Sequence, residues 1–141
     1  MNVGQQLNLA LLRHLLGPIA PWLADPATTD IFVYGHRDVY VKRQGRRIER
    51  AAAAWRSDAD LMLAAESIAE HIRRRLDPDH PILDSRLPDG SRVNIVIPPC
   101  YPQGACVSIR IFPQERYGAA DLVRFGTLDK TGLGILRAMV G

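Results

Sequence analysis

Residues Ile82–Phe112, with the sequence ILDSRLPDGSRVNIVIPPCYPQGACVSIRIF, decide the fold of this chain. The stretch contains three short runs in which apolar and polar residues alternate, as is typical of half-buried β-strands. The first two runs are separated by Leu87–Ser91, LPDGS. In such a turn Pro88 presets φ at the first central position and Gly90 accepts a positive φ. The stretch therefore predicts three antiparallel strands, the first two joined by a tight turn.

The alternation also predicts which side chains share a face of the sheet. The side predicted to be apolar carries Val93, Ile95, Ile97, Val107, Ile109 and Ile111. The other side carries Arg92 and Arg110, and an antiparallel register places these two arginines directly opposite each other. A three-residue turn at Pro88–Gly90 puts Arg86 opposite Arg92, whereas a bulge at Gly90 shifts this pairing by one residue.

An arginine cluster on one sheet face requires a counter-anion, because like charges directly across strands destabilise a sheet. One source is a carboxylate of the chain itself, Asp84 or Asp89, in which case the cluster is an ordinary solvent-exposed face. The other source is a bound phosphate, which suits the planar guanidinium fork. The residue types alone leave both alternatives open.

The composition is that of one globular domain with its own core. The chain has 141 residues, of which 47% are hydrophobic, with a formal net charge of +3 and a pI of about 9.2. This charge is well below that of a nucleic-acid-binding tail. Leu7–Leu16 is too short to span a bilayer and no basic signal-peptide region precedes it, so a cytoplasmic protein is expected.

No metal site is expected. Cys100 and Cys106 do not have the spacing of zinc ligands, and the four histidines are scattered along the chain. The two cysteines can meet across the mouth of a hairpin, but reduced thiols are the usual state in a cytoplasmic protein.

The rest of the chain adds helices and further strands. Helices are expected over residues 5–16, 18–24, 57–76, 119–125 and 128–140, and strands over 30–34, 39–43 and 46–50. Ser57, with Asp60 three residues later, resembles a capping box at the start of the longest helix. The basic run Arg73–Arg75 falls in the last turn of this helix, where the helix dipole favours cations. The order of elements predicts an α+β fold with an antiparallel sheet.

The sequence contains no recognisable catalytic group. It has no evident Ser/His/Asp, Cys/His or paired-carboxylate arrangement, and no Walker A phosphate loop of the form G-x-x-x-x-G-K-[ST]. The chain alone is therefore expected to hydrolyse nothing, although it can contribute arginines to a site that is completed elsewhere.

Two segments resemble a known family. LPDGSRVNIVIPP at 87–99, followed by VSIRIF at 107–112, resembles the N-terminal domain of the type II/type IV secretion ATPase superfamily, especially its tight-adherence-pilus and conjugative-secretion branches. The segments 16–31, 39–45 and 127–140 resemble other parts of that domain in the same order.

This resemblance implies a fold and a domain division. The fold is a PAS-like antiparallel sheet of about six strands flanked by helices, with N-terminal helices and a C-terminal linker helix. Residues 1–26 would form the N-terminal helical segment and 27–114 the PAS-like domain. Residues 115–141 would be linker helices that lead to a RecA-like ATPase core. The phosphate loop would begin just beyond Gly141, so the chain is expected to be a fragment.

The resemblance also implies a site. Arg92 and Arg110 match the family's N-terminal arginines that approach the phosphates of ATP at the junction of the two domains, and Arg86 is a weaker match. The implied cofactor is ATP, with Mg bound by the core domain. The implied partners are the protein's own RecA-like domain, neighbouring subunits of a homohexamer, and inner-membrane secretion or pilus components. The assembled protein would be peripheral to the inner membrane.

Two other functions fit the residues. The first is a ring-assembly and docking module that contacts neighbouring subunits and secretion components. The second is a free-standing PAS-like or nucleic-acid-binding domain. We expect no nucleic-acid partner, because single-strand binders interleave aromatic side chains with basic ones and only Phe112 is expected on the arginine face.

Overall fold

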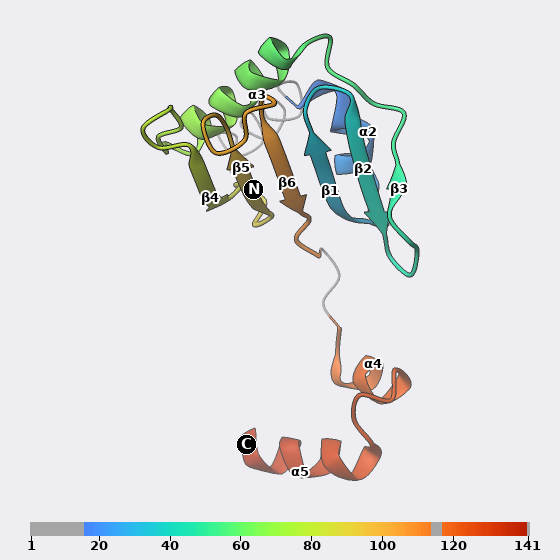
Figure 1. Ribbon diagram of the computed structural model, residues 1–141. Helices are drawn as coiled ribbons and strands as arrows, with labels where there is room; N and C mark the ends of the chain where they lie inside the picture. Colours follow the sequence, from blue (N-terminus) through green and yellow to red (C-terminus); the bar gives the residue numbers. More distant parts are fainter. Residues whose placement is uncertain (1–15, 114–116, 141) are drawn as a thin grey trace, which may run out of the picture.

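The computed structural model describes residues 16–113 and 117–140, in which the central feature is a six-stranded antiparallel sheet (Figure 1). The strand order across the sheet is β3-β2-β1-β6-β5-β4. The strands are β1 (Thr28–Tyr34), β2 (Asp38–Arg43), β3 (Glu49–Arg50), β4 (Ile82–Arg86), β5 (Arg92–Val96) and β6 (Cys106–Arg110). The predicted α+β fold with about six strands is confirmed.

The helices are η1 (Gly17–Ile19), α2 (Ala20–Ala24), α3 (Asp58–His71), α4 (Ala119–Arg124) and α5 (Lys130–Val140). In the chain, α3 connects β3 at one edge of the sheet to β4 at the other. The helices α4 and α5 contact each other and follow β6 in the chain (Figure 1). Within residues 16–113 and 117–140, no helix has the length and apolar character needed to cross a membrane. The helix predicted over 5–16 lies outside the described residues, apart from its last position.

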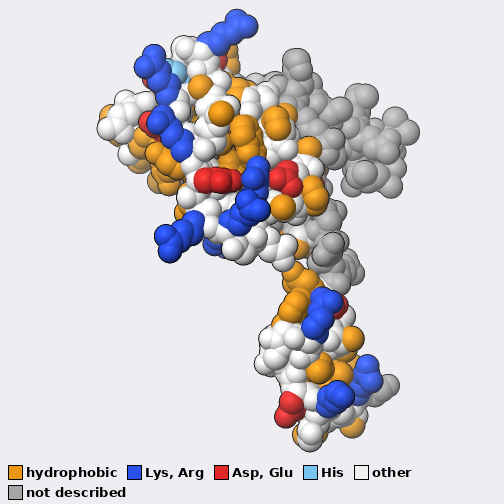
Figure 2. Space-filling model, turned by 90° about the vertical axis from the view of Figure 1, so that its right-hand side faces the viewer, with side chains coloured by type: hydrophobic (Ala, Val, Ile, Leu, Met, Phe, Trp, Pro, Cys, Tyr) orange, Lys and Arg blue, Asp and Glu red, His pale blue; other side chains and the backbone are white. Residues whose placement is uncertain are grey.

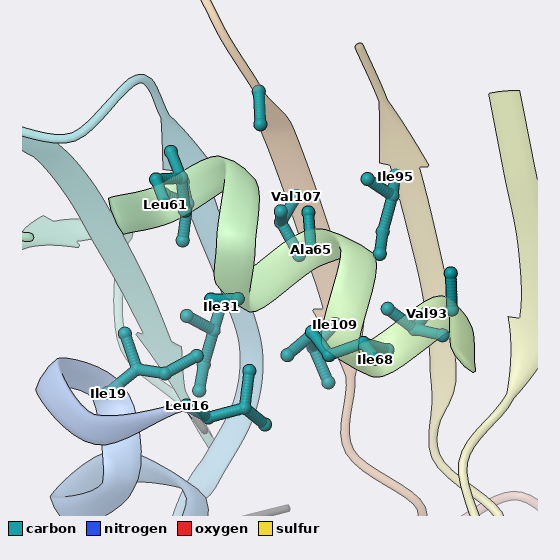
Figure 3. Close-up of a cluster of buried hydrophobic side chains, with 14 of the residues drawn as sticks. Leu16, Ile19, Ile31, Leu61, Ala65, Ile68, Val93, Ile95, Val107 and Ile109 are labelled. Carbon is teal, nitrogen blue, oxygen red and sulfur yellow. The ribbon is translucent and has the colours of Figure 1, made fainter. Parts of the chain in front are cut away.

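The core lies between α3 and one face of the sheet. In Figure 3, Ala65 and Ile68 of α3 lie over side chains from β5 and β6, and Leu16 and Ile19 lie beside Ile31 of β1. The buried sheet residues include Ile31, Val33, Val39, Val41, Val93, Ile95, Val107 and Ile109. This is the face that the alternation predicts to be apolar. Every second residue of a strand lies on the same face of the sheet, and here those residues are the apolar ones. The opposite face carries the polar positions.

The helix α3 begins where predicted and ends earlier. The Ser57 hydroxyl accepts a hydrogen bond from the Asp60 amide at 3.2 Å, as an N-cap does. The helix ends at His71, not at residue 76. Arg73 has φ of 56°, and the amides of Arg73 and Arg74 donate to Glu70 and Ala69 carbonyls at 2.9 and 2.8 Å. These two bonds form a Schellman motif. The arginine run therefore follows the helix and does not form its last turn.

Arg73 occupies a left-handed position that usually belongs to glycine. We expect Arg73→Gly to raise the free energy of unfolding by about 0.5–1 kcal/mol, because glycine adopts positive φ without a Cβ clash. The control is Arg74→Gly, since Arg74 is not among the described residues with positive φ. That substitution should not stabilise the chain. Urea denaturation of both variants checks the prediction, and equal effects of the two substitutions would contradict it.

The third strand is shorter than predicted. The sequence predicts strand over 46–50, but only Glu49 and Arg50 pair with β2, opposite Val41 and Tyr40. The turn after β2 begins at Arg43, whose carbonyl accepts from the Arg46 amide at 3.0 Å, and Gly45 is its third residue, with φ of 69°. Residues 46–48 bring the chain back alongside β2, so they belong to the loop and not to β3.

Candidate functional site

A row of charged side chains crosses the face of the sheet opposite α3. Antiparallel pairing sets Arg86 of β4 opposite Arg92 of β5, Arg92 opposite Arg110 of β6, Arg110 opposite Asp30 of β1, and Asp30 opposite Lys42 of β2. We call these five residues the charged row. The predicted pairings of Arg92 with Arg110 and of Arg86 with Arg92 are confirmed, so Gly90 does not shift the register.

The β4–β5 turn fixes this register. The Gly90 amide donates to the Leu87 carbonyl at 2.9 Å, and the Leu87 amide donates to the Ser91 carbonyl at 2.7 Å. Gly90 has φ of 90°, and a Cβ there would lie 3.2 Å from Cγ of Phe112. The Phe112 ring therefore packs closely over the turn, which explains why glycine is needed at this position.

Ser91 ties the turn to the end of β6. The residue is 1% exposed, and its hydroxyl donates to Asp89 Oδ2 at 2.9 Å and accepts from the Phe112 amide at 2.9 Å. The Ser91 amide donates to Asp89 Oδ1 at 2.9 Å. A buried polar group with all of these partners specifies one geometry, because any displacement leaves it unsatisfied. The positions of Arg92 and Arg110 along their strands are thereby fixed relative to each other.

Each of the two central arginines has a carboxylate partner. Arg92 donates from Nε to Asp84 Oδ1 at 2.9 Å and from Nη2 to Asp84 Oδ2 at 2.6 Å. Arg110 donates from Nε to Asp30 Oδ1 at 3.2 Å. Both guanidinium groups remain open to solvent, with side-chain exposures of 61% for Arg92 and 77% for Arg110.

The other charged side chains near Arg92 and Arg110 have different hydrogen-bond partners. Arg86 donates from Nη1 to the Gly90 carbonyl at 3.2 Å. Asp84 is thus confirmed as a counter-ion of the cluster, whereas Asp89 serves the Ser91 contacts. Asp30 is a counter-ion that the sequence reasoning missed, and its signal is the alternation of Asp30 with the apolar positions of β1.

The contact between Arg92 and Asp84 shifts the pKa of both side chains. Hydrogen bonds from the Arg92 side chain lower the pKa of Asp84 below its ordinary value, and the same bonds raise the pKa of Arg92. Both groups stay ionised at neutral pH. Arg92 therefore already has an anionic partner within the chain.

This pair gives a pH-dependent prediction. We expect Arg92→Met to raise the pKa of Asp84 toward its ordinary value, as followed by NMR titration of carboxyl carbons in this chain. Because the folded pKa lies below the unfolded one, the pair adds stability above the unfolded pKa, and this is lost as pH falls through the folded pKa. Asp77 is an internal control, because hydrogen bonds from His80 and then Arg75 lower its pKa to about 2. An Asp84 titration unaffected by the substitution would contradict the prediction.

The face with the charged row also carries aromatic side chains. Phe32 and Tyr34 of β1 alternate with Asp30, and Tyr40 of β2 is opposite Phe32. The rings of Tyr34 and Tyr40 meet edge to face, with centroids 6.1 Å apart. The expectation that only Phe112 lies on the arginine face was therefore wrong, because it considered only the three strands of the opening segment.

Charges of both signs are mixed on the side of the molecule where β3 lies. Figure 2 shows the side on which β3 lies, where basic and acidic side chains are interspersed and hydrophobic side chains lie beside them. This side of the molecule therefore has no extended field of one sign.

A second polar cluster connects the β1–β2 turn to the start of α3. Asp58 Oδ1 accepts from the His36 amide at 3.0 Å and lies 2.8 Å from His36 Nδ1, while Arg37 Nε donates to His36 Nε2 at 2.9 Å. The hydrogen bonds from His36 lower the pKa of Asp58. These contacts hold two adjacent loops together. Within the described ranges no group of three or more His, Cys, Asp or Glu residues is arranged to hold a metal ion.

The surroundings of Cys106 disfavour its thiolate form. Cys100 and Cys106 are both free, and burial raises the pKa of the Cys106 thiol. A thiol with a raised pKa is a poor nucleophile at neutral pH.

The sequence of this chain is similar to that of a known protein family and of several of its relatives. Residues 14–140 match the model of the type II/IV secretion system protein family. A protein of Methanocaldococcus jannaschii is 35% identical over 116 residues, which cover 81% of this chain and 16% of that protein. VirB11 of Agrobacterium fabrum is 31% identical over 101 residues, which cover 71% of this chain and 28% of VirB11.

A solved structure shares the fold. The crystal structure of the VirB11 ATPase from the Brucella suis type IV secretion system in complex with sulphate matches 92% of this chain and 38% of that chain, with a TM-score of 0.75 and 26% identity. The chain thus spans a minor part of the length of the relatives it matches. Because the family model covers nearly the whole chain, and the sheet has the same architecture as a VirB11 ATPase, this chain belongs to the type II/IV secretion system protein family.

Proposed function

We propose that this chain is the N-terminal domain of a secretion ATPase and that Arg92 and Arg110 contact the phosphates of ATP at a junction with a RecA-like domain. The observation that carries the proposal is the register of the sheet, which sets these two arginines opposite each other on an exposed face. The relationship to the VirB11 ATPase supports the nucleotide as ligand. In this proposal Mg is held by the RecA-like domain.

The geometry suits an oxyanion. The backbones of β5 and β6 are fixed by a core on the other side of the sheet, with Val93 and Ile109 buried. The two arginine side chains therefore project from a rigid base, which favours binding because little backbone order must be gained. Guanidinium groups bind phosphate oxygens with paired hydrogen bonds. Arg86 is a third candidate. It donates to the Gly90 carbonyl, and among the described residues no carboxylate forms an ion pair with it.

The proposed role is electrostatic. Bound ATP supplies a triphosphate whose terminal group is lost on hydrolysis. Arg92 and Arg110 stabilise that negative charge while the two domains are closed, and they lose a contact when the charge leaves. The closed arrangement is thus favoured only in the ATP state, which is the differential interaction that domain motion requires. The division into residues 1–26, 27–114 and 115–141, and the hexameric ring, belong to the same proposal.

A second candidate function is a docking module for ring assembly and for inner-membrane secretion components. The observation that favours it is the exposed apolar surface of α5. Ile135, Leu136 and Met139 are 58%, 47% and 77% exposed in the described structure. Apolar side chains gathered on one short helix commonly mark a contact with another protein segment.

The test is ATP hydrolysis by the full-length protein after both Arg92 and Arg110 are replaced by alanine. Phosphate contact predicts a large loss of activity. A domain that serves only in docking predicts nearly normal hydrolysis by the double variant, so this experiment separates the two functions.

A further inference from the structure

The arginines proposed to contact phosphate already bind carboxylates of the same chain, and the two pairs differ. Asp84 occupies Nε and Nη2 of Arg92, at 2.9 and 2.6 Å. Asp30 contacts only Nε of Arg110, at 3.2 Å. Arg92 is therefore the more firmly held of the two, because a two-point carboxylate contact is stronger and more directional than a single hydrogen bond.

The two carboxylates also differ in how they are held. The Asp30 side chain is 13% exposed, and its second oxygen accepts from the Thr29 hydroxyl at 2.9 Å. Asp84 is 44% exposed, and among the described residues Arg92 is the side chain that donates hydrogen bonds to it. Asp30 is thus part of the folded framework, whereas Asp84 can turn into water when a stronger anion takes its place.

The charge around Arg92 favours such an exchange. The charged row contains Arg86, Arg92, Arg110 and Lys42 as cations and Asp30 as an anion, and Asp84 lies beside it on β4. Two carboxylates against four cations leave a net charge of +2 on this strip of the sheet. An anion with several charges gains from the whole strip, whereas Asp84 gains mainly from the one arginine it touches.

We propose that Asp84 competes with the nucleotide for Arg92, holding this guanidinium until a polyphosphate displaces the carboxylate. The inference rests on the proposed function, because it assumes that Arg92 contacts ATP. It assigns a role to a residue of β4 that does not itself bind the nucleotide. An exposed ion pair contributes little net stability, and a triphosphate displaces it because the triphosphate also interacts with the other cations of the strip. An anion of single charge gains little more from the strip than Asp84 does. Asp84 thereby sets the affinity of the site and restricts it to polyanions.

The experiment measures the affinity of a non-hydrolysable ATP analogue for the full-length protein by isothermal titration calorimetry. We expect Asp84→Asn to tighten binding by roughly threefold to tenfold, because it removes the competing charge and retains the shape of the side chain. The matched control is Asp38→Asn. Asp38 is similarly exposed, at 49%, and pairs with Arg50 at 2.7 Å on β3, away from the row. This control should leave the affinity unchanged within about 1.5-fold.

A third variant combines Asp84→Asn with Arg92→Ala. Compared with Arg92→Ala alone, this double variant should bind the analogue no more tightly, because no guanidinium remains for which the carboxylate competes. Loss of the gain supports the inference. Unchanged or weaker binding by Asp84→Asn alone overturns it, as does an equal gain in Asp38→Asn, which would indicate a general effect of net charge.

The failure of this inference is distinguishable from failure of the proposed function. If Arg92→Ala and Arg110→Ala each weaken binding of the analogue but Asp84→Asn does not strengthen it, only the competition by Asp84 is wrong. If the two alanine variants bind the analogue as tightly as the unaltered protein, the phosphate-contacting role is wrong and the competition by Asp84 is overturned with it.

Discussion

Replacement of both Arg92 and Arg110 by alanine is expected to lower the rate of ATP hydrolysis by the full-length protein by roughly a hundredfold or more. A hydrogen bond to a charged group contributes about 1.5–3 kcal/mol, which corresponds to about tenfold or more for each arginine. The two side chains lie opposite each other on neighbouring strands, so both reach one ligand. Their effects need not add, because residues that share a ligand are coupled.

Two comparisons make this prediction specific. Arg50→Ala removes an arginine of similar exposure, 63%, whose partner is Asp38, and should leave hydrolysis within about twofold. Arg92→Lys keeps the charge but loses the planar fork, so its loss should lie between those of the unaltered and alanine proteins. A double alanine variant that folds and hydrolyses ATP at nearly the normal rate would falsify the proposal.

Local sequence signals account for most of the fold. The alternation in 92–97 and 107–112 fixed both the buried side of the sheet and the pairing of Arg92 with Arg110, because period two and a tight turn leave few registers. The end of α3 was harder to foresee. The apolar pattern continues through Ile72 and Leu76, and both pack against the core although neither is within the helix. Hydrophobic spacing reports burial, not the hydrogen bonds that close a helix.

Long-range pairing accounts for what the sequence reasoning missed in the candidate site. Asp30 and Lys42 enter the charged row because β1 pairs with β6, a strand that follows it by more than 70 residues. No local pattern reports which distant strands become neighbours. The aromatic residues Phe32 and Tyr40 reach the same face for the same reason. The choice between Asp84 and Asp89 as counter-ion likewise depended on the turn, whose buried Ser91 takes both oxygens of Asp89.

Truncation of the core beneath the charged row is expected to have the largest effect on stability. Ile95 of β5 is fully buried and is drawn in Figure 3 among the side chains packed under α3. Ile95→Ala removes buried methyl and methylene groups and leaves a cavity, so the free energy of unfolding should fall by about 2–5 kcal/mol. This is a large fraction of the 5–15 kcal/mol typical of a domain. Urea denaturation measures it as a lower midpoint with an unchanged slope.

Ile82→Ala is the matched control, because Ile82 lies on the adjacent strand and is 58% exposed. Its substitution should cost less than about 1 kcal/mol, since little apolar area returns to water. The comparison bears on the proposed function as well. If the rigid base of the arginines depends on this core, Ile95→Ala should weaken binding of the ATP analogue at temperatures where the variant is still folded, while Ile82→Ala should not. Equal destabilisation by the two substitutions would mean that the face under α3 is not the one that holds the sheet together.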